Sequence, residues 1–264
     1  MHKFLIVLVF LSTCAPASPP KAVVAETSGE SVVDTSFEVQ SSFSRDYLMG
    51  KFDPATHPDF IEIAAGYANR PGMYLRRDAY EAFLSMHAAA LKAGVRLQII
   101  SAARNFTAQK GIWEAKWTGS RLIENGKNAA QAYPDPVQRA LKILEYSSMP
   151  GSSRHHWGTD IDLNNLSPEF FKSGQGRKIH DWLTAHAAEY GFCQPYSPKG
   201  ADRPYGYNEE AWHWSYTPVS RQLMALAGQI LKNEDITGFA GAETAKEIDV
   251  VGKYVLGIYP GCLK

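Results

Sequence analysis

Apolar residues recur with the period of an α-helix at several places along the chain. In DAYEAFLSMHAAALKAG, residues 78–94, good helix formers follow Asp78, which we expect to cap the N-terminus, and Gly94 ends the pattern. Further helices are predicted over residues 108–117, 136–147, 176–190 and 220–232. These segments indicate that helices make up much of the folded part of the chain.

Three short apolar stretches are typical of strands instead. They are VRLQIIS, GTDIDL and WHWSY, at residues 95–101, 158–163 and 212–216. In the second stretch, strand alternation sends Asp160 and Asp162 to one face and Ile161 and Leu163 to the other. Because the predicted helices and strands do not alternate regularly, we expect an α+β fold.

The N-terminal segment differs from the rest of the chain. After Lys3 an apolar run covers residues 4–11, and small residues follow it. The run is too short to cross a bilayer and matches the apolar region of a secretory signal. Two processing routes stay open, because LSTC resembles a lipobox that would lipidate Cys14 and APA fits cleavage after Ala17. We expect an exported protein, periplasmic or in the cell envelope, that contacts the membrane only through such a lipid.

The signal is followed by a segment of different composition. Residues 18–45 are rich in Ser, Thr, Pro, Glu and Val and show no sustained period, so we expect a flexible tether. With 45% hydrophobic residues in 264, the remainder can form one packed core. The predicted organisation is therefore a signal peptide at 1–17, a tether at 18–45 and one domain at 46–264.

Charge and cysteine content narrow the classes of function. Lys plus Arg and Asp plus Glu both number 27, which gives a formal net charge of zero and no basic stripe for nucleic acid. After export only Cys193 and Cys262 would remain, and an oxidising compartment would permit them to pair. The spacing alone gives no Cα separation, so this pairing stays open.

The segment GSSRHHWGTDIDLNN, residues 151–165, gathers His155, His156, Asp160 and Asp162. Histidine and carboxylate side chains are common metal ligands, which makes a metal site one interpretation. A polar loop that leads into a half-buried strand is the other. A catalytic zinc usually takes three protein ligands, so this segment would supply two of them and another segment the third.

The segment NEEAWHWSY, residues 208–216, is the candidate for the third ligand. His213 lies between two tryptophans, and Glu209 and Glu210 precede it by four and three residues. A carboxylate beside a zinc-bound water can take its proton and pass it to a leaving amine. Taken separately, each feature is a weak signal, because such a histidine is more often a core residue.

Together, S-x-H-x-x-G-x-x-x-D and the later E-x-x-H resemble the zinc D-alanyl-D-alanine peptidases of the VanX/VanY type, peptidase family M15 with the LAS fold. A third stretch, ISAARNFTAQ, is similar to the family's SGYRS…Q and precedes the other two in the family's order. The matching residues are Ser101, Arg104 and Gln109, then Ser153, His155, Gly158 and Asp162, then Glu210 and His213.

The resemblance implies roles for these residues. His155, Asp162 and His213 would bind one zinc ion per chain. Glu210 would be the catalytic base, and Arg104 would polarise the carbonyl of the bond that is cut or hold the substrate. It further implies a small, mainly antiparallel sheet flanked by helices in a single domain, as in the LAS and hedgehog-like peptidases.

Other residues have less definite roles. Ser153 and Gln109 would contact the substrate or support the site, and His156 would be a neighbour of the site or lie at its rim. Asp160 stands where the family usually carries a small residue, so it either orients a ligand histidine or is satisfied by local backbone. Residues 111–136 are long for the family and would form a lid, a substrate wall or part of the core.

The function that the resemblance implies is a zinc-dependent carboxypeptidase, acting as a monomer on the stem peptides of bacterial peptidoglycan. D,D-specificity, L,D-specificity and endopeptidase action stay open. A metal-binding module that recognises the cell wall without hydrolysis is the alternative. Glu210 and Arg104 favour the enzyme, because a module that only binds has no need of a proton acceptor.

Overall fold

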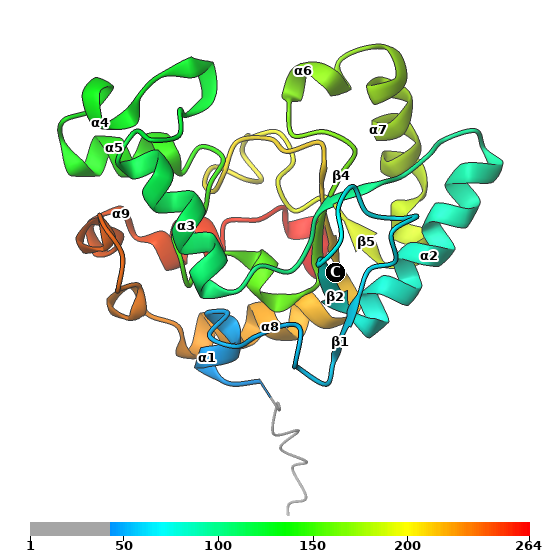
Figure 1. Ribbon diagram of the computed structural model, residues 1–264, viewed down its shortest axis with the longest axis horizontal. Helices are drawn as coiled ribbons and strands as arrows, with labels where there is room; N and C mark the ends of the chain where they lie inside the picture. The colour runs from blue at the N-terminus through cyan, green and yellow to red at the C-terminus, as the bar shows by residue number, and fades with distance from the viewer. Residues whose placement is uncertain (1–42) are drawn as a thin grey trace, which may run out of the picture. The chain divides into compact units, whose positions relative to one another are not determined.

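Four short strands form an antiparallel sheet in the computed structural model, which describes residues 43–264 (Figure 1). Their order is β3, β4, β6, β5, with bounds Ile99–Ser101, Asp160–Leu163, His213–Tyr216 and Phe192–Cys193. A second sheet pairs β1 (Phe60–Glu62) with β2 (Tyr74–Arg76), also antiparallel. The described residues belong to one compact unit, and the α+β class with antiparallel sheets is confirmed.

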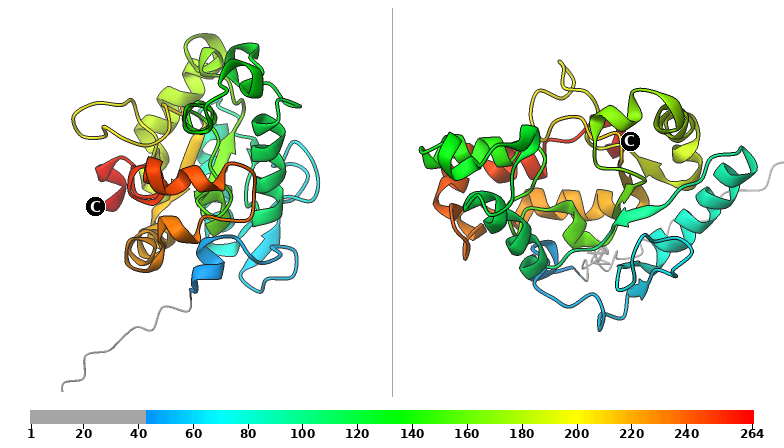
Figure 2. Two further views of the ribbon diagram at one scale, coloured as in Figure 1. Left: turned by 90° about the vertical axis from the view of Figure 1, so that its left-hand side faces the viewer. Right: turned by 45° about the horizontal axis from the view of Figure 1, so that its top comes forward.

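Helices surround the larger sheet (Figures 1 and 2). Their bounds are Arg45–Leu48 for α1, Arg77–Lys92 for α2, Phe106–Trp117 for α3, Ala129–Ala132 for α4, Pro136–Ile143 for α5, Pro168–Phe171 for α6, Gly174–His186 for α7, Thr217–Ile230 for α8 and Ala245–Ile248 for α9. Within the described part of the chain, no helix is both long and apolar enough to cross a membrane. The predicted signal peptide and most of the predicted tether lie outside the described residues.

Strand β4 divides its side chains as its alternation predicts. Ile161 and Leu163 are fully buried in a hydrophobic cluster with residues of α2 and α7, including Phe83 and Leu183. Burying each aliphatic side chain stabilises the fold by roughly 1.5–3 kcal/mol. This burial fixes which face of β4 meets the core, so the aspartates at 160 and 162 point the other way.

Two sequence predictions about α2 and β3 need correction. Asp78 does not cap α2, because the helix begins one residue earlier and Arg76 binds both oxygens of the Asp78 carboxylate. The helix does stop at Gly94, whose φ is +74°. The strand predicted over residues 95–101 is shorter, since its partner β4 ends at Leu163 and the next residue, Asn164, has a φ of +64°, which is outside the range of a strand.

The other helix predictions are correct in place and differ at their ends. The helix predicted at 136–147 stops at Ile143. Beyond the predicted range, the carbonyl oxygen of Ser148 accepts a hydrogen bond from the side chain of Gln109. The helix predicted at 176–190 becomes a 3₁₀ turn over its last residues, Ala187–Tyr190. The helix predicted at 220–232 begins earlier, because Pro218 is favourable in a first turn. The prediction at 108–117 matches α3 closely.

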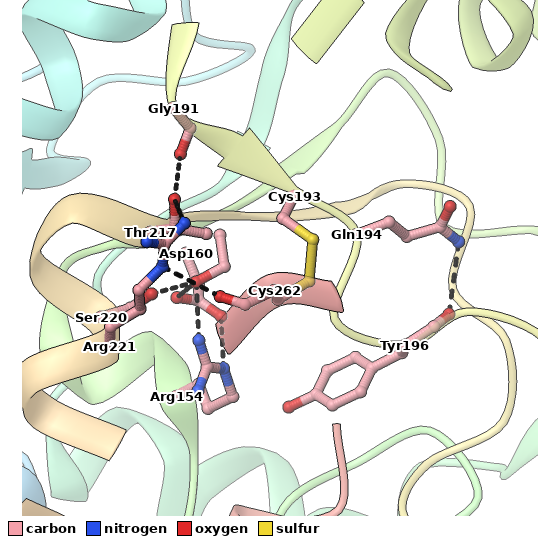
Figure 3. The surroundings of a disulfide bond; sticks show 11 residues. Arg154, Asp160, Gly191, Cys193, Gln194, Tyr196, Thr217, Ser220, Arg221 and Cys262 are labelled. Carbon is pink, nitrogen blue, oxygen red and sulfur yellow. Dashed lines mark hydrogen bonds and ion pairs between the residues drawn. A yellow bond between two sulfur atoms is a disulfide. The ribbon is translucent and has the colours of Figure 1, made fainter. Parts of the chain in front are cut away.

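A disulfide joins Cys193 on β5 to Cys262 near the end of the chain (Figure 3). Their Cα atoms are 5.6 Å apart, and the bond closes a loop with a sequence separation of 69. In the chain-entropy model a loop of that length stabilises the folded state by about 4 kcal/mol. The pairing that the sequence left open is therefore present in the structure.

Candidate metal centre

His155 lies on a short 3₁₀ turn, Arg154–Trp157, that leads into β4. Gly158 ends the turn with a φ of +70°, and an added Cβ there would come within 2.3 Å of the Phe60 ring. His155 Nδ1 is 2.9 Å from the carbonyl oxygen of Ala102, which can only accept, so Nδ1 carries the proton. This leaves Nε2 of His155 free, 3.3 Å from Asp162 Oδ2.

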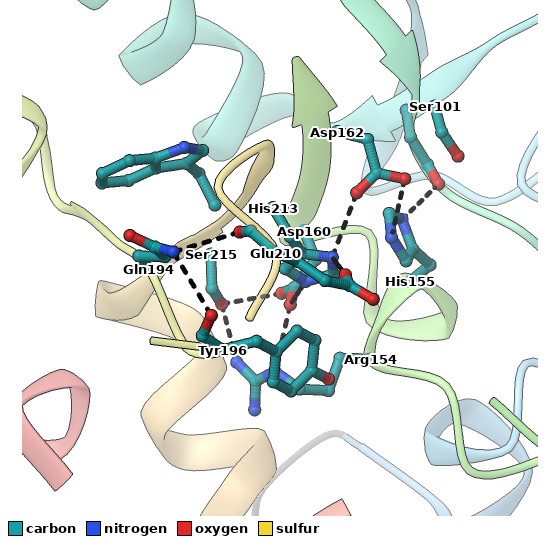
Figure 4. A network of polar contacts seen from close by, with 12 residues as sticks. Ser101, Arg154, His155, Asp160, Asp162, Gln194, Tyr196, Glu210, His213 and Ser215 are labelled. Atoms are coloured by element: carbon teal, nitrogen blue, oxygen red, sulfur yellow. Dashed lines mark hydrogen bonds and ion pairs between the residues drawn. The ribbon is translucent and has the colours of Figure 1, made fainter. Parts of the chain in front are cut away.

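Asp162 and His213 are register partners on β4 and β6. Asp162 Oδ1 and His213 Nδ1 are 3.1 Å apart, yet both atoms are buried and neither has a hydrogen-bond partner in the described part of the chain. One ligand atom from each of His155, Asp162 and His213 lies within 4.8 Å of the others (Figure 4). Two imidazole nitrogens and one carboxylate oxygen, held together and left without partners, fit a divalent metal ion such as zinc.

Asp160 fixes the second nitrogen of His213. Its Oδ2 accepts a hydrogen bond from His213 Nε2 at 2.9 Å, so Nδ1 is the nitrogen left for a metal ion, and it lies 3.1 Å from Asp162 Oδ1. Asp160 also accepts from Arg154 at 3.0 Å and from Ser215 at 2.7 Å. Burial alone would raise the pKa of Asp160, but Arg154 and His213 outweigh it and hold the pKa well below its usual range. Of the two roles considered for Asp160, the orienting contact is the one present.

Glu210 lies beside the three candidate ligands. Its Oε2 is 3.4 Å from His213 Nδ1, and the side chain is 8% exposed. Burial raises the pKa of Glu210, and the contact with His213 opposes this only in part. A carboxylate with a raised pKa suits proton transfer near neutral pH. Its neighbour Glu209 is exposed and has no place in this cluster.

Arg104 approaches the centre from the loop after β3. Its Nη1 is 3.6 Å from Asp162 Oδ2 and donates a hydrogen bond to Ser101, while its Nε donates to Gln109 Oε1 at 2.9 Å. Gln109 in turn donates to the carbonyl of Ser148 at 2.8 Å. Gln109 therefore supports the guanidinium of Arg104. Of the two roles considered for Gln109, substrate contact and support of the site, this contact is of the second kind.

His156 holds the backbone of that loop and does not lie at the rim. It is 1% exposed, its Nδ1 donates to the carbonyl of Arg104 at 2.6 Å, and its Nε2 accepts from the amide of Gly151 at 3.0 Å. Burial lowers the pKa of His156 to about 3, so it stays neutral. With both nitrogens occupied, it has none to offer a metal ion.

The candidate ligands open into a cleft of about 430 Å³, also lined by Arg104, Glu210 and Ser153. Ser153 Oγ is buried and has no hydrogen-bond partner among the described residues, so it can accept or donate a hydrogen bond to a bound molecule. Tyr196 lines the cleft too, with its ring 4.7 Å from that of His213. Sequence analysis missed Tyr196, because this residue lies in an irregular segment without a motif.

Residues 111–136 serve both the core and the cleft. Trp113 is fully buried and donates a hydrogen bond to the carbonyl of Ala240 at 2.8 Å. Four residues on or just after α3 line the cleft: Ile112, Lys116, Arg121 and Glu124. Two of the roles considered for residues 111–136 are therefore present together: the segment contributes to the core and forms a wall of the cleft.

A family model described as "VanY: D-alanyl-D-alanine carboxypeptidase" matches residues 72–219, more than half of the chain. The chain belongs to this family. The matched range contains the candidate ligands, Arg104 and Glu210, and it confirms the resemblance to the VanX/VanY-type peptidases.

Two curated relatives of this VanY-family chain match over part of their length. "Putative carboxypeptidase YodJ" of Bacillus subtilis (strain 168) is 27% identical over 183 residues, which are 66% of this chain and 56% of that protein. An uncharacterized protein of Haemophilus influenzae is 32% identical over 78 residues, 29% of this chain and 53% of that protein. The chain thus spans about half the length of the curated relatives it matches.

Two solved structures are similar to this chain. The LD-carboxypeptidase LdcB is 21% identical, with a TM-score of 0.47 over 81% of each chain. A mutant of the D,D-pentapeptidase VanY from a VanB-type resistance cassette, in complex with Zn(II), is 20% identical. Its TM-score is 0.45, over 69% of this chain and 93% of that chain. Membership of the VanY family rests on the family model.

Proposed function

We propose that the protein is an exported, monomeric zinc carboxypeptidase that removes the terminal D-alanine from stem peptides of bacterial peptidoglycan. The observation that carries the proposal is the buried group of His155, Asp162 and His213 with Glu210 beside it. Membership of the VanY family supports the substrate class. Export is inferred from the apolar N-terminal run, which lies outside the described residues.

One zinc ion per chain, held by His155 Nε2, Asp162 and His213 Nδ1, would act as a Lewis acid that makes a water molecule acidic enough to react near neutral pH. The carboxylate of Glu210 accepts the proton of that water and later donates it to the amine that leaves. Asp160 keeps His213 in the tautomer that leaves Nδ1 free.

Arg104 supplies the positive charge for the carbonyl that is attacked. Its guanidinium is held by Gln109 and Ser101 and is still 20% exposed at the side chain, so it can reach the substrate. A well-placed donor to the developing oxyanion lowers the barrier by about 2.7–4 kcal/mol. The unpartnered hydroxyl of Ser153 is available to a polar group of the substrate.

The test is incubation of the zinc-loaded protein with defined muropeptides, followed by mass spectrometry of the products. D,D-carboxypeptidase action converts a pentapeptide stem to a tetrapeptide and leaves the tetrapeptide intact. Release of alanine from the tetrapeptide would instead show L,D-specificity, and cleavage of cross-linked dimers would show endopeptidase action. Binding of muropeptides without any cleavage would favour the recognition module.

A further inference from the structure

Helix α3 forms one wall of the cleft and leads away from the metal centre. Gln109, Ile112 and Lys116 lie on one face of the helix and all line the cleft. Gln109 contacts Arg104, whereas Lys116 lies seven residues farther along, about 10 Å at the rise of an α-helix. Figure 1 shows α3 running towards α4 and the segment that joins them. The cleft therefore has a second polar region, about 10 Å along α3 from the contact between Gln109 and Arg104.

This second region holds two charged groups with unused bonding capacity. Lys116 Nζ donates to Glu124 Oε1 at 2.8 Å, and the Lys116 side chain is 6% exposed. The other oxygen of Glu124, Oε2, is buried and has no hydrogen-bond partner in the part of the chain that the structure describes. Arg121 also lines the cleft, and its exposed guanidinium makes no hydrogen bond or ion pair with any described residue.

The chemistry of these two groups is complementary to a zwitterion. A buried carboxylate oxygen without a donor is unfavourable, and an ammonium group would satisfy it. A free guanidinium binds a carboxylate through two parallel hydrogen bonds. We propose that Glu124 and Arg121 form a subsite for a substrate side chain that ends in both an ammonium and a carboxylate group. The proposal rests on the proposed function and names the side chain that this enzyme prefers.

The distance along α3 between Gln109 and Lys116 is compatible with a peptide bound in the cleft. An extended peptide advances about 3.3–3.6 Å per residue, so 10 Å corresponds to roughly three residues. A carboxypeptidase has only one residue on the leaving side of the bond that is cut. The subsite therefore receives a side chain from the retained part of the peptide, one to three residues before that bond.

The experiment compares two peptides that end in D-alanyl-D-alanine and differ in the residue before it. One carries lysine, whose side chain ends in an ammonium alone, and the other carries diaminopimelic acid, whose side chain ends in both groups. The wild type is expected to show a KM about tenfold lower for the second peptide, because one charged hydrogen-bonded contact is added. The kcat values are expected to be equal, since the subsite receives a side chain and not the bond that is cut.

Arg121→Gln is the decisive variant, because Arg121 is exposed and its replacement breaks no contact in the described residues. It is expected to raise KM for the diaminopimelic acid peptide about tenfold and to leave the lysine peptide unchanged. Glu124→Gln is expected to raise KM for both peptides, since both carry the ammonium. Lys127→Gln is the matched control, because it removes an exposed charge of the same segment that does not line the cleft.

Equal KM values for the two peptides in the wild type would overturn the subsite, as would a preference that survives in Arg121→Gln or disappears in Lys127→Gln. If the wild type cleaves neither peptide, the proposed function fails. Calorimetric binding of the same peptides to the zinc-loaded wild type and Arg121→Gln then decides the subsite by itself. Binding that is tighter for diaminopimelic acid only when Arg121 is present supports it, and equal binding refutes it.

Discussion

Asp162 Oδ1 and His213 Nδ1 face each other at 3.1 Å across strands β4 and β6, buried and without a hydrogen bond. The two residues are direct partners in the register of the sheet. A slip of one residue would turn either side chain to the opposite face and separate the pair. The geometry of the candidate metal centre therefore depends on the register in which β4 and β6 pair.

The first prediction concerns the metal ligands. His155→Ala and His213→Ala should each remove most of the bound zinc, because a site with three protein ligands that loses one rarely keeps its metal. His156→Ala should keep it, since both nitrogens of His156 are bound to the backbone. Metal analysis after dialysis measures this. Loss of zinc in His156→Ala with retention in His155→Ala would refute the assignment of ligands.

The second prediction concerns the proton acceptor. Glu210→Gln should lower kcat by about 10²–10⁴-fold, because glutamine keeps the shape but cannot take a proton. Zinc content and the melting temperature should stay close to those of the wild type. Glu209→Gln is the control, as Glu209 is exposed and carries the same charge one residue away. Equal losses in both variants would point to a general effect of charge.

The third prediction concerns Asp160. Asp160→Asn should weaken zinc binding by about 10–100-fold, because the anion that orients His213 becomes a neutral amide. Competition with a chelator, below the melting temperature of the variant, gives the affinity. Ser215→Ala is the control, since it removes another partner of Asp160 without touching His213. An unchanged zinc affinity in Asp160→Asn would leave Asp160 with a structural role only.

The fourth prediction concerns His156 and acid. Its pKa is about 3 in the folded protein against 6.5 for an unperturbed histidine, so the unfolded chain binds the proton more tightly. The stability from this neutral histidine is complete above pH 6.5 and is lost as the pH falls towards about 3. In that window it contributes a slope of about 1.4 kcal/mol per pH unit to the unfolding free energy.

Urea unfolding of the metal-free wild type and of His156→Gln at several pH values measures this slope. Glutamine cannot titrate, so the wild type should lose stability faster on acidification, and the difference between the two proteins should change below pH 6.5. A constant difference across the whole range would mean that His156 does not titrate on unfolding.

Much of the fold and the site could be predicted from local patterns. The alternation in GTDIDL placed Asp160 and Asp162 on one face, and the structure has them there because Ile161 and Leu163 fill the core. Helix ends were less predictable. Asp78 was expected to cap α2, but Arg76, two residues earlier, engages its carboxylate instead.

Other parts of the site leave no local signal. The contact between Asp160 and His213 joins residues 53 positions apart and depends on the register of two strands. The position of Tyr196 against His213 depends on the path of an irregular segment. The pair of Lys116 and Glu124 is visible as two ordinary charges in the sequence, and only the fold shows that they face the cleft.

The disulfide between Cys193 and Cys262 also determines how the protein responds to a protease. The exposed turn at residues 199–202 lies between His155 and Asp162 on one side and Glu210 and His213 on the other. Exposed turns of this kind are preferred sites of proteolytic cleavage. A single cut there would divide the chain between its candidate zinc ligands, yet both fragments would remain one covalent molecule through the bond between Cys193 and Cys262.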